Sequence, residues 1–317
     1  IRDLLAKAIE LDANLLIAKN LLGHTFWDDE PNKAIEIYLD NLNEAAVIGN
    51  NNIEKKSLHN LGLIYRTIIN DYKKSLQYHL HQLNLCKTTG DYKGEVLASL
   101  CIGNVYYDIG DYDNANKYYL LNYDLARKME EKEIYFIEML LLMGTVNNAV
   151  GKYDSALDYY KRALETFNKN KPDDWEDKFE RFIINYGNGD IGRVLCNMGR
   201  YNEAIEYFQK MTSNYDWFMA NGRIWHYLQI NTYLQLSYKK LGKKYDLGII
   251  NDLLLKTKYI EYETHYHLYQ LFEDTTHLYN AYTNLMEKAS AMEEELAAKF
   301  LSYPIPKAIV EEWEKVK

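Results

Sequence analysis

Glycines that follow an apolar residue recur along this chain at a nearly constant distance. The recurring positions are Gly23, Gly62, Gly103, Gly144 and Gly192, with spacings of 39, 41, 41 and 48 residues. Self-similarity with a period of 20 to 50 residues is the sequence signature of repeat proteins. The chain is therefore expected to consist of one structural unit used several times.

The unit is predicted to be helical. No proline occurs between Pro31 and Pro172, a stretch of 140 residues, and a proline inside a helix costs about 3 kcal/mol. Apolar residues recur at i, i+3, i+4 and i+7, whereas alternation with a period of two is nowhere sustained. We therefore predict an all-α fold in which helical pairs stack, because one pair cannot bury its apolar face alone.

Each pair is expected to have a defined turn. A second glycine follows seven residues after three of the first ones, at Gly110, Gly151 and Gly199. An aromatic residue, then an alanine and then another aromatic residue follow this turn, as in Tyr153, Ala156 and Tyr160. The turn glycine suits the left-handed conformation that ends a helix. The earlier glycine, such as Gly144, is predicted to let the second helix approach the first.

This pattern resembles the tetratricopeptide repeat family over nearly the whole chain, most clearly at 144–163 (GTVNNAVGKYDSALDYYKRA) and 199–211 (GRYNEAIEYFQKM). A common form of the repeat has 34 residues, so most units here are longer. The long form is similar to the arrays of bacterial peptide-sensing regulators, Leu-Gly-Asn-type polarity adaptors and kinesin light chains. The resemblance implies a right-handed α-α superhelix of about seven helical hairpins.

Three parts are expected along the chain. Residues 1–13 read as a half-repeat that ends a preceding unit, residues 14–303 as the repeat array, and residues 304–317, with Trp313, as a capping helix. The half-repeat and the absence of an initiator methionine predict that the sequence is an excerpt of a longer protein. The segment 168–190 breaks the period; it is read as a longer connection with an early helix start, or as an insertion that contacts a partner.

Composition limits the function. Lys and Arg total 37 against 46 Asp and Glu, a net charge of −9, which argues against binding to a phosphate backbone and against an RNA-binding repeat. No run reaches the roughly 18 apolar residues of a membrane helix. Cys86, Cys101 and Cys196 lie far apart without a CxxC pair, so reduced thiols and a cytoplasmic location are expected.

No catalytic, cofactor or metal site is predicted. His79 and His81, like His265 and His267, are two residues apart and would point in different directions on a helix, so these histidines are expected on the surface or in a groove. Each cysteine could act as a nucleophile only if a histidine approached it in space. The glycines 187, 189 and 192 spell a dinucleotide fingerprint but lack the required strand, so we read them as a chance match.

The resemblance implies that first helices line a concave groove that holds a protein or peptide segment. The expected groove residues are Asn20, His24, Trp27, His59, Arg66, Asn104, Tyr107, Asn148, Arg193, Asn197 and Lys239. A side-chain amide can both donate to and accept from an extended peptide backbone, although asparagine is also simply common in this chain. The dispersed cations do not match the carboxylate clamp of chaperone-binding family members.

Two classes of function remain open from the sequence. The first is a non-catalytic scaffold that binds a peptide or protein, as the sensor or regulatory region of a larger bacterial signalling or effector protein. The second is the regulatory part of an enzyme, such as a cyclase, kinase, signalling ATPase or caspase-like peptidase, whose fused or associated catalytic domain lies outside this chain.

Overall fold

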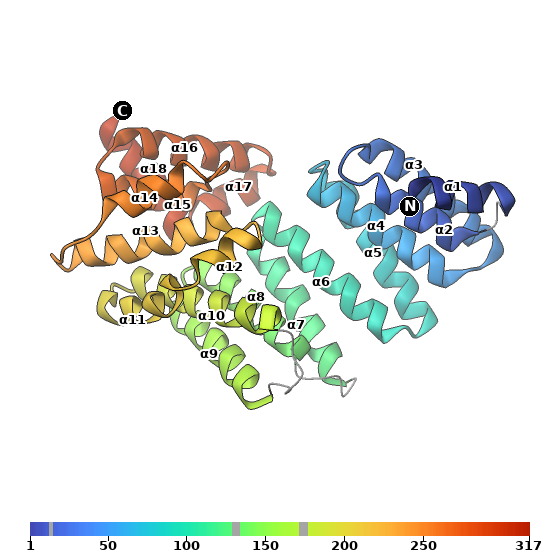
Figure 1. Ribbon diagram of the computed structural model, residues 1–317, viewed down its shortest axis with the longest axis horizontal. Helices are drawn as coiled ribbons and strands as arrows, with labels where there is room; N and C mark the ends of the chain where they lie inside the picture. The colour runs from blue at the N-terminus through green and yellow to red at the C-terminus, as the bar shows by residue number, and fades with distance from the viewer. Residues whose placement is uncertain (13–14, 129–133, 171–176) are drawn as a thin grey trace. The chain divides into compact units, whose positions relative to one another are not determined.

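The computed structural model describes residues 1–12, 15–128, 134–170 and 177–317 (Figure 1). All regular secondary structure within these ranges is α-helical, which confirms the predicted fold class. The chain forms two compact units, Ile1–Glu131 and Lys132–Lys317. The single array that the sequence predicts over 14–303 stays a prediction, because each unit is defined by itself.

The described part of the first unit, residues 1–12 and 15–128, contains seven helices. They are α1 (Arg2–Leu11), α2 (Leu16–Thr25), α3 (Pro31–Ile48), α4 (Asn51–Thr67), α5 (Tyr72–Thr89), α6 (Tyr92–Ile109) and α7 (Tyr112–Lys128). After α1, they pack as the pairs α2/α3, α4/α5 and α6/α7, and the first helix of each pair also contacts the first helix of the next.

The second unit continues the same pattern. Its helices are α8 (Ile134–Ala149), α9 (Tyr153–Asn170), α10 (Asp177–Asn197), α11 (Tyr201–Thr212), α12 (Tyr215–Ala220), α13 (Ile224–Lys240), α14 (Leu247–Leu254), α15 (Tyr262–Phe272), α16 (Thr275–Ser290), α17 (Glu294–Leu301) and α18 (Pro304–Val316). The short helix α12 is an addition to the pairs α8/α9, α10/α11, α13/α14 and α15/α16.

The two helices of five pairs approach closely at the glycine of the first helix, as predicted, and an aromatic ring of the second helix packs on that glycine. A β-carbon added to the glycine of the first helix would lie less than 3.0 Å from a ring of the second helix. The glycine–ring pairs are Gly23–Tyr38, Gly62–His79, Gly103–Tyr119, Gly144–Tyr160 and Gly192–Phe208. Because the ring occupies the space of the missing side chain, the two helix backbones can approach closely.

Local signals end the helices where the sequence indicates. Gly110 and Gly151 adopt the left-handed conformation, with φ of 88° and 84°. In the second pair, whose turn departs from the repeat pattern, Asn70 takes the left-handed conformation instead. Asp71 and Asp91 then cap the next helices by accepting from the backbone N–H of Lys74 and Gly94, which satisfies donors that a helix start otherwise leaves unpaired.

The long helix α10 explains two features of the sequence. It begins at Asp177 and has 21 residues, so the early helix start is confirmed, while Pro172 and the rest of 171–176 lie outside the described residues. Gly187, Gly189 and Gly192 all lie within this helix and face Leu164, Met211 and Phe208. These glycines therefore serve helix packing and do not form a phosphate-binding loop.

The last helix contacts elements far from it in sequence. Trp313 stacks on Tyr282 of α16, with ring centroids 5.2 Å apart. A β-carbon on Gly151 would lie 2.7 Å from Cγ of Pro304, so the start of α18 lies against the turn between α8 and α9. The beginning and the end of the second unit are therefore in contact.

Candidate functional site

The predicted groove residues all lie on first helices or directly after one. We call the surface formed by α2, α4 and α6 the first-helix face of unit 1, and that formed by α8, α10, α13 and α15 the first-helix face of unit 2. Seven of the eleven residues, from Asn20 to Tyr107, belong to unit 1, and Asn148, Arg193, Asn197 and Lys239 belong to unit 2. A continuous groove through all eleven stays a prediction.

Amide side chains bridge neighbouring repeats in both units. In unit 1, the amide of Asn60 on α4 donates to Oδ1 of Asn20 on α2 at 3.0 Å. In unit 2, the amide of Asn197 on α10 donates to Oδ1 of Asn148 on α8 at 3.0 Å. Asn20, Asn60 and Asn197 are half-buried, whereas Asn148 is buried. The amides thus lie between consecutive repeats.

The end of the unit 1 face formed by α4 and α6 carries an ion pair and an amide held by a hydrogen bond. Nε of Arg66 on α4 donates to Oδ2 of Asp108 on α6 at 2.6 Å, and the two side chains are 23% and 28% exposed. The hydroxyl of Tyr119 donates to Oδ1 of Asn104 at 2.8 Å. Asn104 is half-buried, and the hydrogen bond to its oxygen fixes the orientation of an amide that also has two N–H donors.

Aromatic rings lie at the opposite end of the unit 1 face, at the end of α2. The rings of His24 and Trp27 meet edge-on with centroids 5.0 Å apart, and Trp27 in turn contacts Tyr38 at 6.2 Å. Trp27 follows α2 and is half-buried. Tyr107 packs against Tyr112 of the next helix with ring centroids 5.4 Å apart. The face therefore combines apolar surface with amides and one ion pair.

The unit 2 face contains a charged network that the sequence analysis missed. Arg193 donates to Oδ1 of Asp190 at 2.9 Å and to both carboxylate oxygens of Glu263 at 3.1 Å. The hydroxyl of Tyr233 donates to Glu263 at 2.5 Å. The side chains of Asp190, Arg193 and Glu263 are only 9%, 13% and 17% exposed. Arg193 therefore ties α10 to α15 across α13.

Burial and charge act in opposite directions on these carboxyl groups. Burial raises the pKa of Asp190 to about 6, against the lowering effect of Arg193. Burial acts to raise the pKa of Glu263 as well, but Arg193, His267 and the hydroxyl of Tyr233 together hold it below its usual value. The difference arises because Glu263 receives two bonds from the guanidinium and one from a phenol.

Lys239 donates hydrogen bonds to the C-terminal end of α15. Its Nζ donates to the backbone oxygens of Gln270 and Leu271 at 3.0 and 2.9 Å and to the carboxylate of Glu273 at 2.7 Å. Glu273 has a positive φ of 61° and ends α15. A cation at this end is favourable because the last carbonyls of a helix are unpaired and carry partial negative charge. Lys239 thus has a structural role in the fold of unit 2.

The described histidines and cysteines differ in part from their predicted positions. The expectation that the histidines lie on the surface or in a groove is wrong for His79 and His267, which are 0% and 5% exposed because each ring packs inside the helix stack. All three cysteines are buried reduced thiols. A histidine does approach Cys101: its Sγ lies 3.9 Å from Nδ1 of His59.

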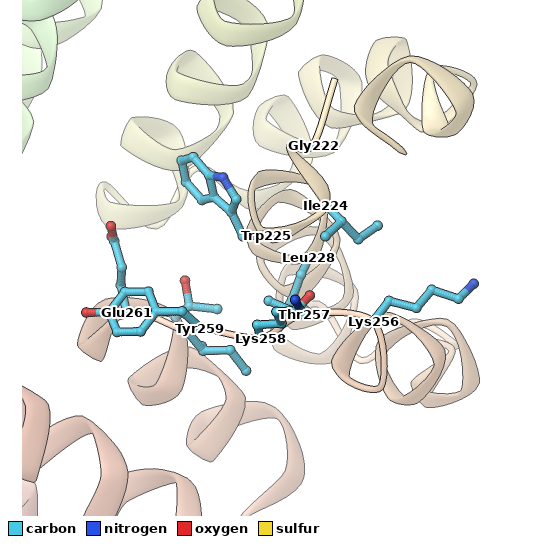
Figure 2. Close-up of a pocket in the computed structure, with 11 residues that line it drawn as sticks. Gly222, Ile224, Trp225, Leu228, Lys256, Thr257, Lys258, Tyr259 and Glu261 are labelled. Atoms are coloured by element: carbon cyan, nitrogen blue, oxygen red, sulfur yellow. The ribbon is translucent and has the colours of Figure 1, made fainter. Parts of the chain in front are cut away.

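A separate pocket of about 520 Å³ lies in unit 2, at the start of α13 and the loop between α14 and α15. Figure 2 shows Trp225 and Tyr259 at this pocket, with Lys256 extending at its other side. Trp225 is 40% and Tyr259 69% exposed. None of the eleven predicted groove residues lines this pocket, and no repeat signature marks it in the sequence.

Helical pairs joined by a glycine–ring contact, with first helices that meet along one face, define a helical-repeat protein. Three family models described as tetratricopeptide repeat match residues 57–91, 95–169 and 189–211. The chain is a tetratricopeptide repeat protein. A search of curated proteins by sequence found no significant match. None of the described helices combines the length and apolar character required to cross a membrane.

Solved structures of Rap proteins share this fold. The apo form of RapI aligns over 95% of this chain and 99% of its own, at 14% identity and a TM-score of 0.62. A Rap protein complexed with competence and sporulation factor covers 100% and 82%, at 16% and 0.57. The Rap conjugation gene regulator of plasmid pLS20, in complex with the Phr* peptide, covers 84% and 76%, at 16% and 0.51. At this level of identity, the likeness describes the fold.

Proposed function

We propose that this chain is a non-catalytic scaffold that binds an extended peptide segment on the first-helix face of unit 1. The observation that carries the proposal is that three successive first helices each present a half-buried amide, at Asn20, Asn60 and Asn104. One of the similar solved structures is a complex with competence and sporulation factor, and another is a complex with the Phr* peptide. These complexes support a peptide as the partner.

The spacing of the helices suits this partner. Packed helices lie 8–10 Å apart, and an extended chain advances about 3.3 Å per residue. One amide per repeat would therefore meet the peptide backbone about every third residue. Because an amide both donates and accepts, it can pair with the N–H or the C=O of the backbone whatever the peptide side chains are.

Side-chain selectivity would come from the two ends of the face. Trp27 offers a half-buried aromatic surface, and aromatic residues commonly dominate binding energy. The partly exposed pair of Arg66 and Asp108 can exchange its ion pair for a charged or polar group of the ligand. The expected ligand is a peptide of mixed apolar and polar character.

The first-helix face of unit 2 is less suitable for binding a peptide than that of unit 1. Its central charges are already paired with each other, since Arg193 contacts Asp190 and Glu263 and all three are largely buried. A peptide would have to replace these internal bonds at the cost of unpairing buried charges. We therefore propose the first-helix face of unit 1 as the surface that binds the peptide.

Selection from a displayed library of random peptides, followed by titration of the selected peptide, tests the proposal. The double variant Asn60→Ala with Asn104→Ala should raise the Kd about tenfold or more, because each lost hydrogen bond contributes about 1 kcal/mol. Asn43→Ala, which removes an exposed amide from the second helix α3, is the matched control. A selected peptide that depends on Trp225 in the unit 2 pocket, and not on Asn60 and Asn104, contradicts the proposal.

We further propose that the chain serves as the sensor or regulatory region of a larger bacterial signalling protein in the cytoplasm. The support is the repeat family together with the peptide complexes among the similar structures. Assay of the protein with and without its selected peptide, as part of the full-length gene product, tests this role. The alternative, regulation of an attached enzyme, also stays a prediction.

A further inference from the structure

Three side chains capable of binding a metal meet inside unit 1. They are His59 on α4, His79 on α5 and Cys101 on α6, and their ligand atoms all lie within 4.8 Å of one another. Sγ of Cys101 lies 3.9 Å from Nδ1 of His59. The residues are 20 and 22 positions apart in sequence, so only the packing of three consecutive helices brings them together.

His79 departs from the repeat at the position that holds its ring. The equivalent positions in the other four glycine–ring pairs are occupied by Tyr38, Tyr119, Tyr160 and Phe208. The hydroxyls of Tyr119 and Tyr160 donate to Asn104 and Thr145 on the paired first helix. A phenol or a phenyl ring therefore suffices for packing, and packing alone does not explain an imidazole here.

The imidazole of His79 also has an unused nitrogen. The residue is 0% exposed, and its Nε2 is buried without a hydrogen-bond partner. Its other nitrogen, Nδ1, lies 3.3 Å from Oε1 of the buried Gln82. Since Oε1 can only accept, Nδ1 carries the proton and Nε2 carries a lone pair. Metal-binding histidines are held in the same way, with the second nitrogen donating to an oxygen.

The three groups are largely shielded from water. His79 and Cys101 are buried and His59 is half-buried. The guanidinium of Arg66, on the same helix as His59, is paired with the carboxylate of Asp108 at 2.6 Å, so its charge is compensated beside the cluster.

We propose that His59, His79 and Cys101 bind a zinc ion. Two imidazoles and one thiolate are typical zinc ligands, and bond lengths of about 2.1 Å to nitrogen and 2.3 Å to sulfur place tetrahedral ligand atoms about 3.3–3.6 Å apart. Binding would therefore draw the ligand atoms, which now lie within 4.8 Å of one another, closer together by side-chain rotation. On binding, the thiol of Cys101 forms the Zn–S bond and its proton passes to solvent.

The site would have two properties. Three protein ligands leave the fourth position of a tetrahedral ion to water or to a donor atom of another molecule. The ion would also join α4, α5 and α6, and hence two consecutive repeats, so that metal binding would stabilise unit 1.

Cobalt(II) as a spectroscopic probe for zinc tests the proposal on the reduced full chain. We expect one equivalent of Co²⁺ to give tetrahedral d–d bands and a thiolate-to-cobalt charge-transfer band, and zinc to displace it. His79→Phe installs the ring that Phe208 provides in another repeat, so this variant should keep its helical circular dichroism but lose the bands. Cys101→Ser should lose the charge-transfer band, and Gln82→Ala should weaken binding about 10- to 100-fold with all ligands present.

Matched controls separate this site from adventitious binding. His81→Ala removes the more exposed histidine of α5, and Cys196→Ser removes a buried thiol of unit 2; both should bind cobalt as the parent does. The absence of a charge-transfer band in the parent protein, or equal cobalt affinity in the parent and in His79→Phe, overturns the proposal. Because cobalt binding is measured without peptide, and Asn60→Ala with Asn104→Ala retains all three ligands, failure of the metal site and failure of peptide binding can be told apart.

Discussion

The guanidinium of Arg193 donates to both carboxylate oxygens of Glu263 at 3.1 Å, although the two residues are 70 positions apart. Removing one member of a largely buried pair leaves the other charge without compensation, which costs about 3–5 kcal/mol. Glu263→Gln should therefore lower the free energy of unfolding of unit 2 by about this amount, measured by urea denaturation.

The surface pair of Arg200 and Glu203 provides the comparison for this experiment. Arg200 donates to Glu203 at 2.7 and 2.6 Å, but both side chains are well exposed. Exposed pairs contribute little because water screens them. Glu203→Gln should leave the urea midpoint nearly unchanged; equal losses in the two variants would show that the buried network has no special role.

Gly144 and Tyr160 test the contact that defines the repeat. A β-carbon on Gly144 would lie 2.6 Å from Cε1 of Tyr160, so Gly144→Ala should destabilise by about 1–3 kcal/mol through overpacking. Gly248→Ala, on the exposed surface of α14, should be neutral or slightly stabilising, because alanine favours a helix.

A compensating substitution makes the test of this contact specific. Tyr160→Leu opens space above Gly144, so the double variant should lose less stability than the sum of the two single variants. Additive losses in thermal denaturation would mean that the helices do not depend on this approach.

His226 should make stability depend on pH. It is 2% exposed, and burial lowers its pKa to about 3 from an ordinary value of 6.5. Between these values the unfolded chain binds the proton and the folded chain does not, so stability is complete above about pH 6.5 and falls as the pH falls towards 3. The slope contributed by this residue approaches 1.4 kcal/mol per pH unit.

His226→Phe should remove that share of the acid sensitivity while keeping an aromatic ring beside Tyr186 and Phe218, which the imidazole now contacts. His81→Phe, at a largely exposed position, should leave the slope as it is. Unfolding free energies between pH 4 and 7 decide the matter; an unchanged slope in His226→Phe would mean that the ring is protonated in the folded protein.

The last helix should protect unit 2 from association. Trp313 packs on Tyr282 and Tyr279 with ring centroids 5.2 and 5.7 Å apart. Deleting residues 307–317 removes Trp313 and the buried Ile309, which would uncover the ring of Tyr282 and the apolar surface under Ile309. Exposed apolar patches promote association. Light scattering should detect oligomers of the truncated chain, whereas Lys315→Ala should remain as soluble as the parent.

The sequence by itself determined the helices, their pairing and the close approach of paired helices at their glycines. These features depend on residues close in the chain, and the same pattern occurs several times. Gly103 with Tyr119 and Gly144 with Tyr160 therefore have the same geometry. The turn glycines were predictable for the same reason, since the left-handed conformation at Gly110 and Gly151 is a local property of the backbone.

Only the tertiary structure decided which polar side chains meet. Arg193 was a predicted groove residue, but its partner Glu263 lies two helical pairs further on, where the repeat signature is weak. His79 was considered with its neighbour His81, yet the histidine ring that it meets, with centroids 5.9 Å apart, is His59 on another helix. Helix packing sets such contacts through the rotation and offset of whole helices, which a local sequence pattern does not encode.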